Sequence, residues 1–190
     1  IFKALAAALS LRPDRGVILS ESTNFPTDVY MMQGLEAFSG GRIKSVTVAP
    51  EAIMEALDET VAALLLTQVH YKSGLVRDMA EITRRAHEMG VLVIWDLSHS
   101  AGAIEVDLNA ADADFAIGCG YKFLNGGPGA PAYIYVAERH QSAVQPLSGW
   151  FGHARPFAFE EEYTPAPGIE RFLCGTPQVL GLAALECGVD

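Results

Sequence analysis

Short apolar runs rich in β-branched residues alternate with helical patterns along the whole chain, and this alternation constrains the fold more than any other feature. The clearest run, Val-Leu-Val-Ile-Trp at 91–95, is followed directly by Asp96. The run at 62–67 is apolar apart from its final threonine, as in a strand that is buried on both faces. Alternating β and α units of this length are typical of a largely parallel sheet covered by helices. We therefore expect an α/β fold with three layers, in which helices flank a mostly parallel sheet.

The expected elements follow one another at short intervals. Strands are predicted at 16–20, 42–48, 62–67, 91–95, 115–119 and 133–136, and helices at 26–38, 50–57, 78–89 and from 180 onward. Asn24 is a candidate N-terminal cap of the first helix, and Gly90 is the expected glycine after the third. Ligands of such sheets bind outside the carboxyl ends of the strands, so polar residues just after strands are the candidates for a site.

The composition excludes several classes of protein. Half of the 190 residues are hydrophobic and only 19% are charged, whereas disordered chains combine low hydrophobicity with high charge. The formal net charge of -10 argues against nucleic acid and anionic membranes as main partners, because phosphate binding needs clustered Lys and Arg. No apolar run approaches the length of a membrane-spanning helix, which needs about 18 residues.

The three cysteines, Cys119, Cys174 and Cys187, show neither a CxxC motif nor a spacing typical of metal sites. The simplest interpretation is three reduced thiols in a cytoplasmic protein without a metal centre. The chain begins with Ile1 rather than Met, and its last helical pattern stops at Asp190. We therefore expect a piece of a longer protein, in which other segments contribute to any site.

The first candidate for chemistry is the segment Asp-Leu-Ser-His-Ser at 96–100, directly after the strongest strand. A carboxylate at the carboxyl end of a strand is placed to meet a ligand rather than to fill the core. The alternative is purely structural, because Asp, Ser and His are also common in turns and helix caps.

The second candidate is Lys122, in the segment Gly-Cys-Gly-Tyr-Lys-Phe at 118–123 after another predicted strand. A lysine in apolar surroundings can act as an amine nucleophile, although most lysines are simply solvated. The glycines at 126, 127 and 129 would let the backbone approach a ligand closely, but a structural turn explains them equally well.

Asp96, His99 and Lys122 together are more specific than either segment alone. A lysine can bond covalently to the aldehyde of pyridoxal phosphate, and an ionised carboxylate can keep the ring nitrogen of that cofactor protonated. The protonated ring then accepts electrons from a carbanion. The carboxylate, a histidine three residues later and a lysine 26 residues later therefore predict a pyridoxal-phosphate site.

These segments resemble kynureninase, a fold-type-I pyridoxal-phosphate enzyme related to the class-V aminotransferases. The matching stretches are Trp-Asp-Leu-Ser-His-Ser-Ala-Gly at 95–102 and Gly-Tyr-Lys-Phe-Leu-Asn-Gly-Gly-Pro-Gly at 120–129. Asn-Phe-Pro-Thr-Asp at 24–28, Gly-Trp-Phe-Gly-His at 149–153 and Phe-Leu-Cys-Gly-Thr-Pro at 172–177 resemble further blocks of that family. The Asp, His and Lys pattern is shared with cysteine desulfurases, whereas the Phe-Pro-Thr-Asp and Gly-Trp-Phe-Gly-His blocks narrow the resemblance to kynureninase.

The resemblance implies a role at the cofactor for each matching residue. Lys122 would carry the cofactor and move protons with the assistance of Tyr121, and Asp96 would bind the ring nitrogen. Phe25 would stack on the ring, and His99 would lie beside the aspartate. The remaining contacts to the ring or the phosphate would come from Pro26, Thr27, Asp28, Thr67, Trp150 and Thr176.

Several of these residues also have ordinary structural interpretations. Phe25 could pack against its own helix, Trp150 could belong to a core or an interface, and Thr67 could bond only to backbone. The remaining histidines are expected to lie on the surface or to have ordinary partners: His70, His87, His140 and His153.

The implied activity is hydrolysis of L-kynurenine to anthranilate and L-alanine, with its 3-hydroxy form as a second candidate substrate. This is a cytoplasmic step of tryptophan catabolism that leads towards NAD biosynthesis. The family forms homodimers, and residues 1–190 would be an incomplete cofactor-binding large domain, without the phosphate-loop segment and the small domain. Thr176 favours kynurenine over the 3-hydroxy form. Two alternatives remain: a cysteine desulfurase-like enzyme, which needs a catalytic cysteine on a mobile loop, and a non-catalytic scaffold with the same fold.

Overall fold

The computed structural model describes residues 1–190, and its centre is a six-stranded sheet with the strand order β2-β1-β3-β4-β5-β6. The strands are β1 (Val17–Glu21), β2 (Lys44–Val48), β3 (Val61–Thr67), β4 (Leu92–Asp96), β5 (Phe115–Cys119) and β6 (Ala132–Val136). The first five strands run parallel, and only β6 is antiparallel, beside β5. The expected mostly parallel α/β sheet is therefore confirmed.

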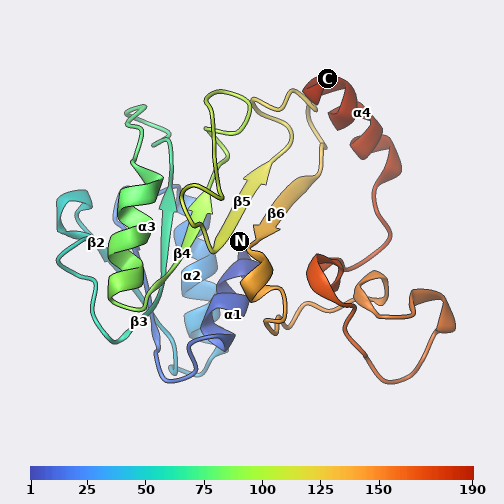
Figure 1. Ribbon diagram of the computed structural model, residues 1–190, viewed down its shortest axis with the longest axis horizontal. Coiled ribbons are helices and arrows are strands. Elements are labelled where there is room, and N and C mark those ends of the chain that lie inside the picture. Colours follow the sequence, from blue (N-terminus) through green and yellow to red (C-terminus); the bar gives the residue numbers. More distant parts are fainter.

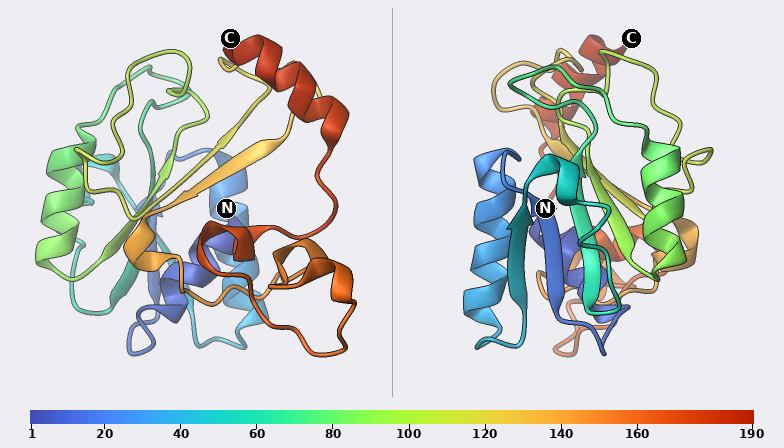
Figure 2. Two further views of the ribbon diagram at one scale, coloured as in Figure 1. Left: turned by 45° about the vertical axis from the view of Figure 1, so that its right-hand side comes forward. Right: turned by 90° about the vertical axis from the view of Figure 1, so that its left-hand side faces the viewer.

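Helices cover both faces of this sheet. The α-helices are α1 (Phe2–Ser10), α2 (Pro26–Phe38), α3 (Met79–Glu88) and α4 (Val179–Val189). The short 3-10 helices are η1 (Pro50–Ala52), η2 (Glu138–His140), η3 (Trp150–Gly152), η4 (Pro156–Ala158) and η5 (Gly168–Phe172). Because α1 and α2 lie on one face and α3 on the other, the sheet is the middle of three layers (Figure 2). Every helix falls short of the length and apolar character that crossing a membrane requires.

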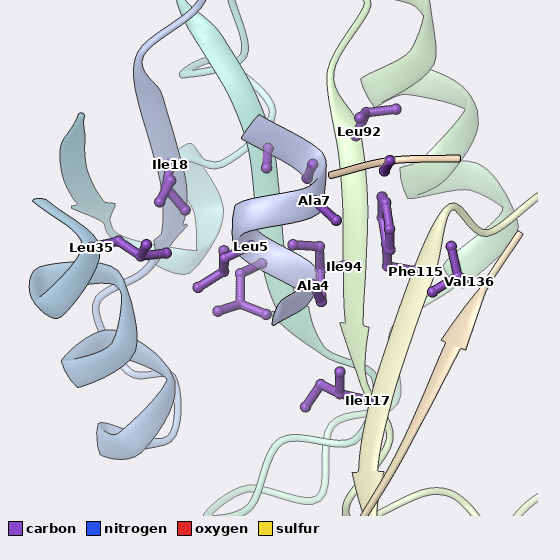
Figure 3. Packing of buried hydrophobic residues seen from close by; sticks show 14 of the residues in the cluster. Ala4, Leu5, Ala7, Ile18, Leu35, Leu92, Ile94, Phe115, Ile117 and Val136 are labelled. Atoms are coloured by element: carbon purple, nitrogen blue, oxygen red, sulfur yellow. The ribbon is translucent and has the colours of Figure 1, made fainter. Parts of the chain in front are cut away.

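The core is divided between the two faces of the sheet. On the first face, α1 packs across the strands, and Leu5 is fully buried among residues such as Ile94 and Phe115 (Figure 3). On the second face, Trp95 is fully buried, and its indole N–H donates to Thr83 Oγ1 of α3 at 3.1 Å. Burial of each large side chain contributes about 1.5–3 kcal/mol, so the alternation of residues along β4 fixes which helix covers which face.

Three details differ from the expectations. The helix expected at 50–57 is only the short turn η1, after which the chain forms turns that bury Ile53. Asn24 is not the cap of α2: the capping position is Phe25, and the Asn24 amide instead donates to Ser20 Oγ at 3.0 Å. The third difference is α1, which is not among the expected elements because its Ala-rich sequence begins without a capping side chain.

The order of the strands creates a switch point between β1 and β3. From β1 the chain moves outward to β2, and it then returns past β1 to build β3, β4 and β5 in the other direction. In parallel sheets, ligands bind at the carboxyl ends of the strands beside such a point. The loops that follow β3, β4 and β5 form the upper edge of the molecule in Figure 1. The fold therefore points to this carboxyl edge of the sheet as the place of a site.

Candidate active site

Side chains from four strand ends meet at the carboxyl edge of the sheet. Phe25 follows β1, Thr67 ends β3, Asp96 ends β4, and Lys122 follows β5. Thr67 and Asp96 are direct neighbours in the parallel register of β3 and β4. The topology of the sheet therefore assembles a cluster from residues that are far apart in the sequence.

The amine of Lys122 lies among rings. Its Nζ is 3.1 Å from His99 Nε2, 5.4 Å from the centre of the Phe25 ring and 5.6 Å from the centre of the Tyr121 ring. The Tyr121 side chain is half exposed. A protonated Lys122 donates to His99 Nε2, which places the imidazole proton on Nδ1. After it loses a proton, an amine held in this way can act as a nucleophile.

His99 is the neutral partner in this contact. Burial lowers the pKa of His99 from its ordinary value, and the positive charge of Lys122 lowers it further, while Asp96 acts in the opposite direction. The uncharged ring can therefore accept a hydrogen bond from the ammonium group. Its other nitrogen, Nδ1, is buried and has no hydrogen-bond partner in the chain.

Two buried carboxyl groups lie side by side at this edge. Asp96 is 3% exposed, and its Oδ1 accepts a hydrogen bond from Ser98 N at 2.7 Å. Asp28, in the first turn of α2, is 1% exposed. Burial, and then the negative charge of Asp96, raise the pKa of Asp28 to about 7. Because two adjacent carboxylates repel each other, the charge of Asp96 acts against the ionisation of Asp28.

Three buried polar atoms of the cluster have no partner in the chain, namely Asp28 Oδ2, Thr67 Oγ1 and His99 Nδ1. Buried polar atoms of folded proteins are almost always paired, so an unpaired set indicates a place for a ligand. Pyridoxal phosphate offers a ring nitrogen for the carboxyl pair, an aldehyde for the lysine and a flat face for the aromatic rings. The residues therefore fit the cofactor that the family resemblance implies.

Other residues expected at the site lie at its margin or elsewhere. Pro26 and Thr27 are exposed in the first turn of α2. Trp150 packs on aromatic rings of its own segment, and Thr176 is exposed shortly before α4. Neither forms a hydrogen bond or a ring contact with Lys122, and the segment from η3 to η5 lies apart from the carboxyl edge (Figure 1). A single chain therefore brings together only part of the expected set.

Tyr71 belongs to the cluster although the sequence analysis did not identify it. Its ring stands edge-on to Phe25, with 5.2 Å between ring centres, and lies nearly parallel to His99 at 6.4 Å. Tyr71 follows the end of β3 by four residues. The signal that could have found it is this position after a strand, which is the same signal that singled out Asp96 and Lys122.

The other four histidines have hydrogen-bond partners within the chain, as expected. These partners are Thr23 O for His70, Asp114 for both His87 and His140, and Glu162 O for His153. None of the four contacts Lys122, and only His70 lies next to a residue of the cluster, Tyr71.

The sequence matches the model of the class-V aminotransferase family over residues 2–190. Kynureninase of Deinococcus radiodurans is 54% identical over 190 residues, and kynureninase of Pseudomonas fluorescens is 49% identical over 196 aligned positions. Both alignments include the whole chain but cover only 46% and 47% of these relatives. The chain thus spans about half the length of the curated relatives that it matches.

Solved structures of pyridoxal-phosphate enzymes share the fold. The apo cysteine desulfurase of Thermococcus onnurineus NA1 gives a TM-score of 0.76 at 23% identity, over 99% of this chain and 49% of that one. A variant of C-DES with glycine covalently linked to its pyridoxal-phosphate cofactor gives 0.77 at 19% identity, over 92% and 48%. These likenesses concern the fold alone, and they agree with the expected fold-type-I architecture. The match to the family model over residues 2–190 shows that the chain belongs to the class-V aminotransferase family.

Proposed function

We propose that this chain is the cofactor-binding part of a kynureninase, which uses pyridoxal phosphate to hydrolyse L-kynurenine to anthranilate and L-alanine. The observation that carries the proposal is the contact of Lys122 with His99 beside the buried Asp96. It occurs in a chain that is 54% identical to one kynureninase and 49% identical to another. We place the reaction in tryptophan catabolism, on a route towards NAD biosynthesis, and in the cytoplasm.

Each group at the carboxyl edge has a task in this proposal. Lys122 would bond to the cofactor aldehyde, and Asp96 would pair with the ring nitrogen. Phe25 would stack on the ring, and His99 would lie beside Asp96 at its edge. Asp28, whose pKa is raised to about 7 by burial and by the charge of Asp96, would lie beside Asp96 at the ring nitrogen. Bound pyridoxal phosphate supplies an electron sink for the negative charge that develops on the substrate.

Lys122 Nζ would also take the proton from the α-carbon of the substrate. Neutral His99, 3.1 Å away, accepts a hydrogen bond from the resulting ammonium group and so supports the transfer. Tyr121, whose ring centre is 5.6 Å from Nζ, is the candidate for assisting proton transfer and for binding the phosphate. A water molecule would attack the γ-carbonyl carbon, and cleavage of the bond between Cβ and Cγ would separate anthranilate from alanine.

We further propose that the enzyme is a homodimer. Trp150 and Thr176 do not contact Lys122 within one chain, and in this proposal a second copy brings them to the cofactor phosphate. Two rings beside Trp150, Phe157 and Phe159, are about three-quarters exposed and offer an apolar surface for such a contact.

The extent of the chain fits an incomplete large domain in this proposal. Residues 1–190 contain the sheet edge with the lysine, the carboxyl pair and the stacking ring. In this proposal a phosphate-loop segment and a small domain lie outside these residues. The substrate is a small molecule, and the net charge of -10 disfavours nucleic acid or an anionic membrane as a further partner.

The proposal is tested with the full gene product that contains this chain, supplied with pyridoxal phosphate. We expect release of fluorescent anthranilate from L-kynurenine and no sulfide from L-cysteine. Lys122→Ala should abolish turnover, whereas Lys44→Ala, a matched change at an exposed lysine paired with Glu36, should retain it. Substantial hydrolysis by the Lys122→Ala variant contradicts the proposal. Sulfide in place of anthranilate would favour the desulfurase alternative, and a folded protein with neither activity would favour the scaffold.

A further inference from the structure

Tyr71 has no task in the proposed reaction, yet it contacts Phe25 and His99, two of the three rings around Lys122. The Tyr71 ring stands at 86° to Phe25, and the planes of Tyr71 and His99 differ by 27°. Lys122 Nζ lies 5.4 Å from the centre of the Phe25 ring and 3.1 Å from His99 Nε2. Tyr71 therefore links two groups that come from different loops.

Tyr71 lies in a short hairpin, residues 68–77, that follows β3. The hairpin is closed by two backbone hydrogen bonds of 2.9 Å, from Arg77 N to Gln68 O and from His70 N to Leu75 O. At its base, Gln68 N donates to Asp96 O at 3.0 Å. The hairpin that carries Tyr71 is thus tied to the strand end that carries the carboxylate of the site.

A buried ion pair ties the same hairpin to β1. Glu21, the last residue of β1, is fully buried, and its carboxylate binds the guanidinium of Arg77, whose side chain is 10% exposed. A carboxylate that is removed from water is stable only when it is paired, so this contact cannot open without leaving a buried charge. The pair therefore fixes where the hairpin ends relative to the loop between β1 and α2.

His70 supplies a second tie between the hairpin and that loop. Its Nδ1 accepts hydrogen bonds from Lys72 N and Ser73 N, both at 3.3 Å, so the ring proton lies on Nε2. Nε2 then donates to Thr23 O at 3.0 Å and lies 3.8 Å from a carboxylate oxygen of Glu21. Because His70 precedes Tyr71 directly, this contact determines the direction in which the tyrosine leaves the backbone.

We propose that Tyr71 is a positioning residue, held by the anchored hairpin against Phe25 and His99. Its edge limits Phe25 to one orientation, and its face packs on His99, whose Nδ1 has no partner in the chain. Without the tyrosine, both rings gain alternative rotamers, and the hydrogen bond between His99 and Lys122 forms in only part of the population. The consequence for catalysis rests on the proposed function, whereas the effect on the two rings does not.

The direct test substitutes Tyr71→Leu in the full gene product before any cofactor is added. One readout is the ring-nitrogen NMR signals of His99, which are identified by their absence in His99→Gln. The other is the rate at which an amine-reactive reagent modifies Lys122. We expect the His99 signals to shift and the labelling rate to change about three- to tenfold, the size of one aromatic contact.

Two control variants separate positioning from general packing. Tyr71→Phe keeps the ring and should leave both readouts unchanged. Tyr135→Leu removes a half-buried tyrosine of β6 that contacts neither ring, so it should also leave them unchanged. In the enzyme loaded with cofactor, Tyr71→Leu should lower kcat about three- to tenfold with a smaller change in KM, because a positioning role acts on the groups around Lys122 rather than on substrate binding.

The anchor is tested with Arg77→Lys, which keeps the charge but loses the planar geometry of the pair. It should shift the NMR signals of His99 in the same direction as Tyr71→Leu does. The variant with both substitutions should show a shift no larger than that of Tyr71→Leu alone. If the shifts caused by Arg77→Lys and Tyr71→Leu add fully in the double variant, the ion pair does not act through Tyr71. Unchanged His99 signals and Lys122 labelling in Tyr71→Leu would overturn the positioning role. Failure of the unaltered protein to bind pyridoxal phosphate would instead contradict the proposed function.

Discussion

The amine of Lys122 lies 3.1 Å from Nε2 of His99, although the two residues follow different strands. The contact exists because β4 and β5 are parallel neighbours, so their carboxyl ends and the loops after them lie side by side. A neutral imidazole at this distance accepts a hydrogen bond from the ammonium group and directs it into the site. The geometry of the site therefore depends on how closely these two loops pack.

Gly102 allows that close packing. Its φ is +84°, and a Cβ at this position would lie 2.3 Å from Phe123 O, in the residue after Lys122. We expect Gly102→Ala to lower the free energy of unfolding by about 1–3 kcal/mol beyond the cost of the backbone strain alone, because one loop must move. Urea unfolding measures the loss, and the NMR signals of His99 should shift as well.

Gly40→Ala is the matched control for this substitution. Gly40 has a similar φ of +65° but no atom within 4 Å of a built Cβ, so only the strain remains, at about 1 kcal/mol. Equal losses in the two variants would show that the approach of the two loops has no energetic importance.

The raised pKa of Asp28 predicts that stability decreases as the pH rises. Its folded-state pKa of about 7 lies above the ordinary value of 3.8, so the folded chain keeps a proton that the unfolded chain has already lost. Between these two values the free energy of unfolding should fall with rising pH, by at most about 1.4 kcal/mol per pH unit. Asp28→Asn should flatten this dependence, as measured by urea unfolding at a series of pH values.

The exposed Asp14 provides a matched control, because Asp14→Asn removes a carboxyl group that lies outside the site. The free energy of unfolding of Asp14→Asn should depend on pH as it does in the unaltered chain, over the range between the unfolded and folded pKa values of Asp28. A slope that persists in Asp28→Asn would mean that another group takes up the proton.

Asp114 is expected to be the most sensitive carboxylate for stability. Burial alone would raise its pKa, yet hydrogen bonds from His140, His87 and Val93 N hold the pKa below its usual range. Such a carboxylate stabilises the fold above its ordinary pKa, and the contribution is lost only as the pH falls through the lowered value. Asp114→Ala should cost about 3–5 kcal/mol at neutral pH, because it leaves buried partners unpaired.

Asp112→Asn tests an exposed carboxylate that binds the same arginine, Arg139. The Asp112 side chain is 66% exposed and its φ is +48°, a conformation that asparagine tolerates, so loss of its charge should cost less than about 1 kcal/mol in urea unfolding. Losses of similar size in the Asp112 and Asp114 variants would contradict the role of burial.

The parts of the fold that could be predicted are those that a local pattern determines. β4 and β3 are apolar runs of strand length, and the helix expected at 26–38 has the bounds of α2. Asp96 and Lys122 could be found because each follows such a run, and a parallel sheet brings the ends of its strands together. The hydrophobic pattern was sufficient to predict these strands and this helix, and the position after a strand was sufficient to identify the two residues.

The remaining parts depend on contacts between distant residues. Tyr71 reaches the site because the hairpin is anchored by the Glu21–Arg77 ion pair, and nothing in the local sequence shows that pairing. Trp150 follows no strand directly, so its place in the fold could not be derived from the sheet. The helix α1 is held by packing of its small side chains on the sheet rather than by a cap, and it therefore gave no terminal signal.

The central claim is that Lys122 carries pyridoxal phosphate, and one measurement tests it directly. The full gene product is incubated with the cofactor, its visible absorbance is recorded, and it is then reduced with borohydride and mapped by mass spectrometry. We predict an absorbance band and the mass of the reduced cofactor on Lys122, with neither in Lys122→Ala and both retained in Lys44→Ala. A folded protein that shows no band, or that carries the label on a different lysine, would contradict the account.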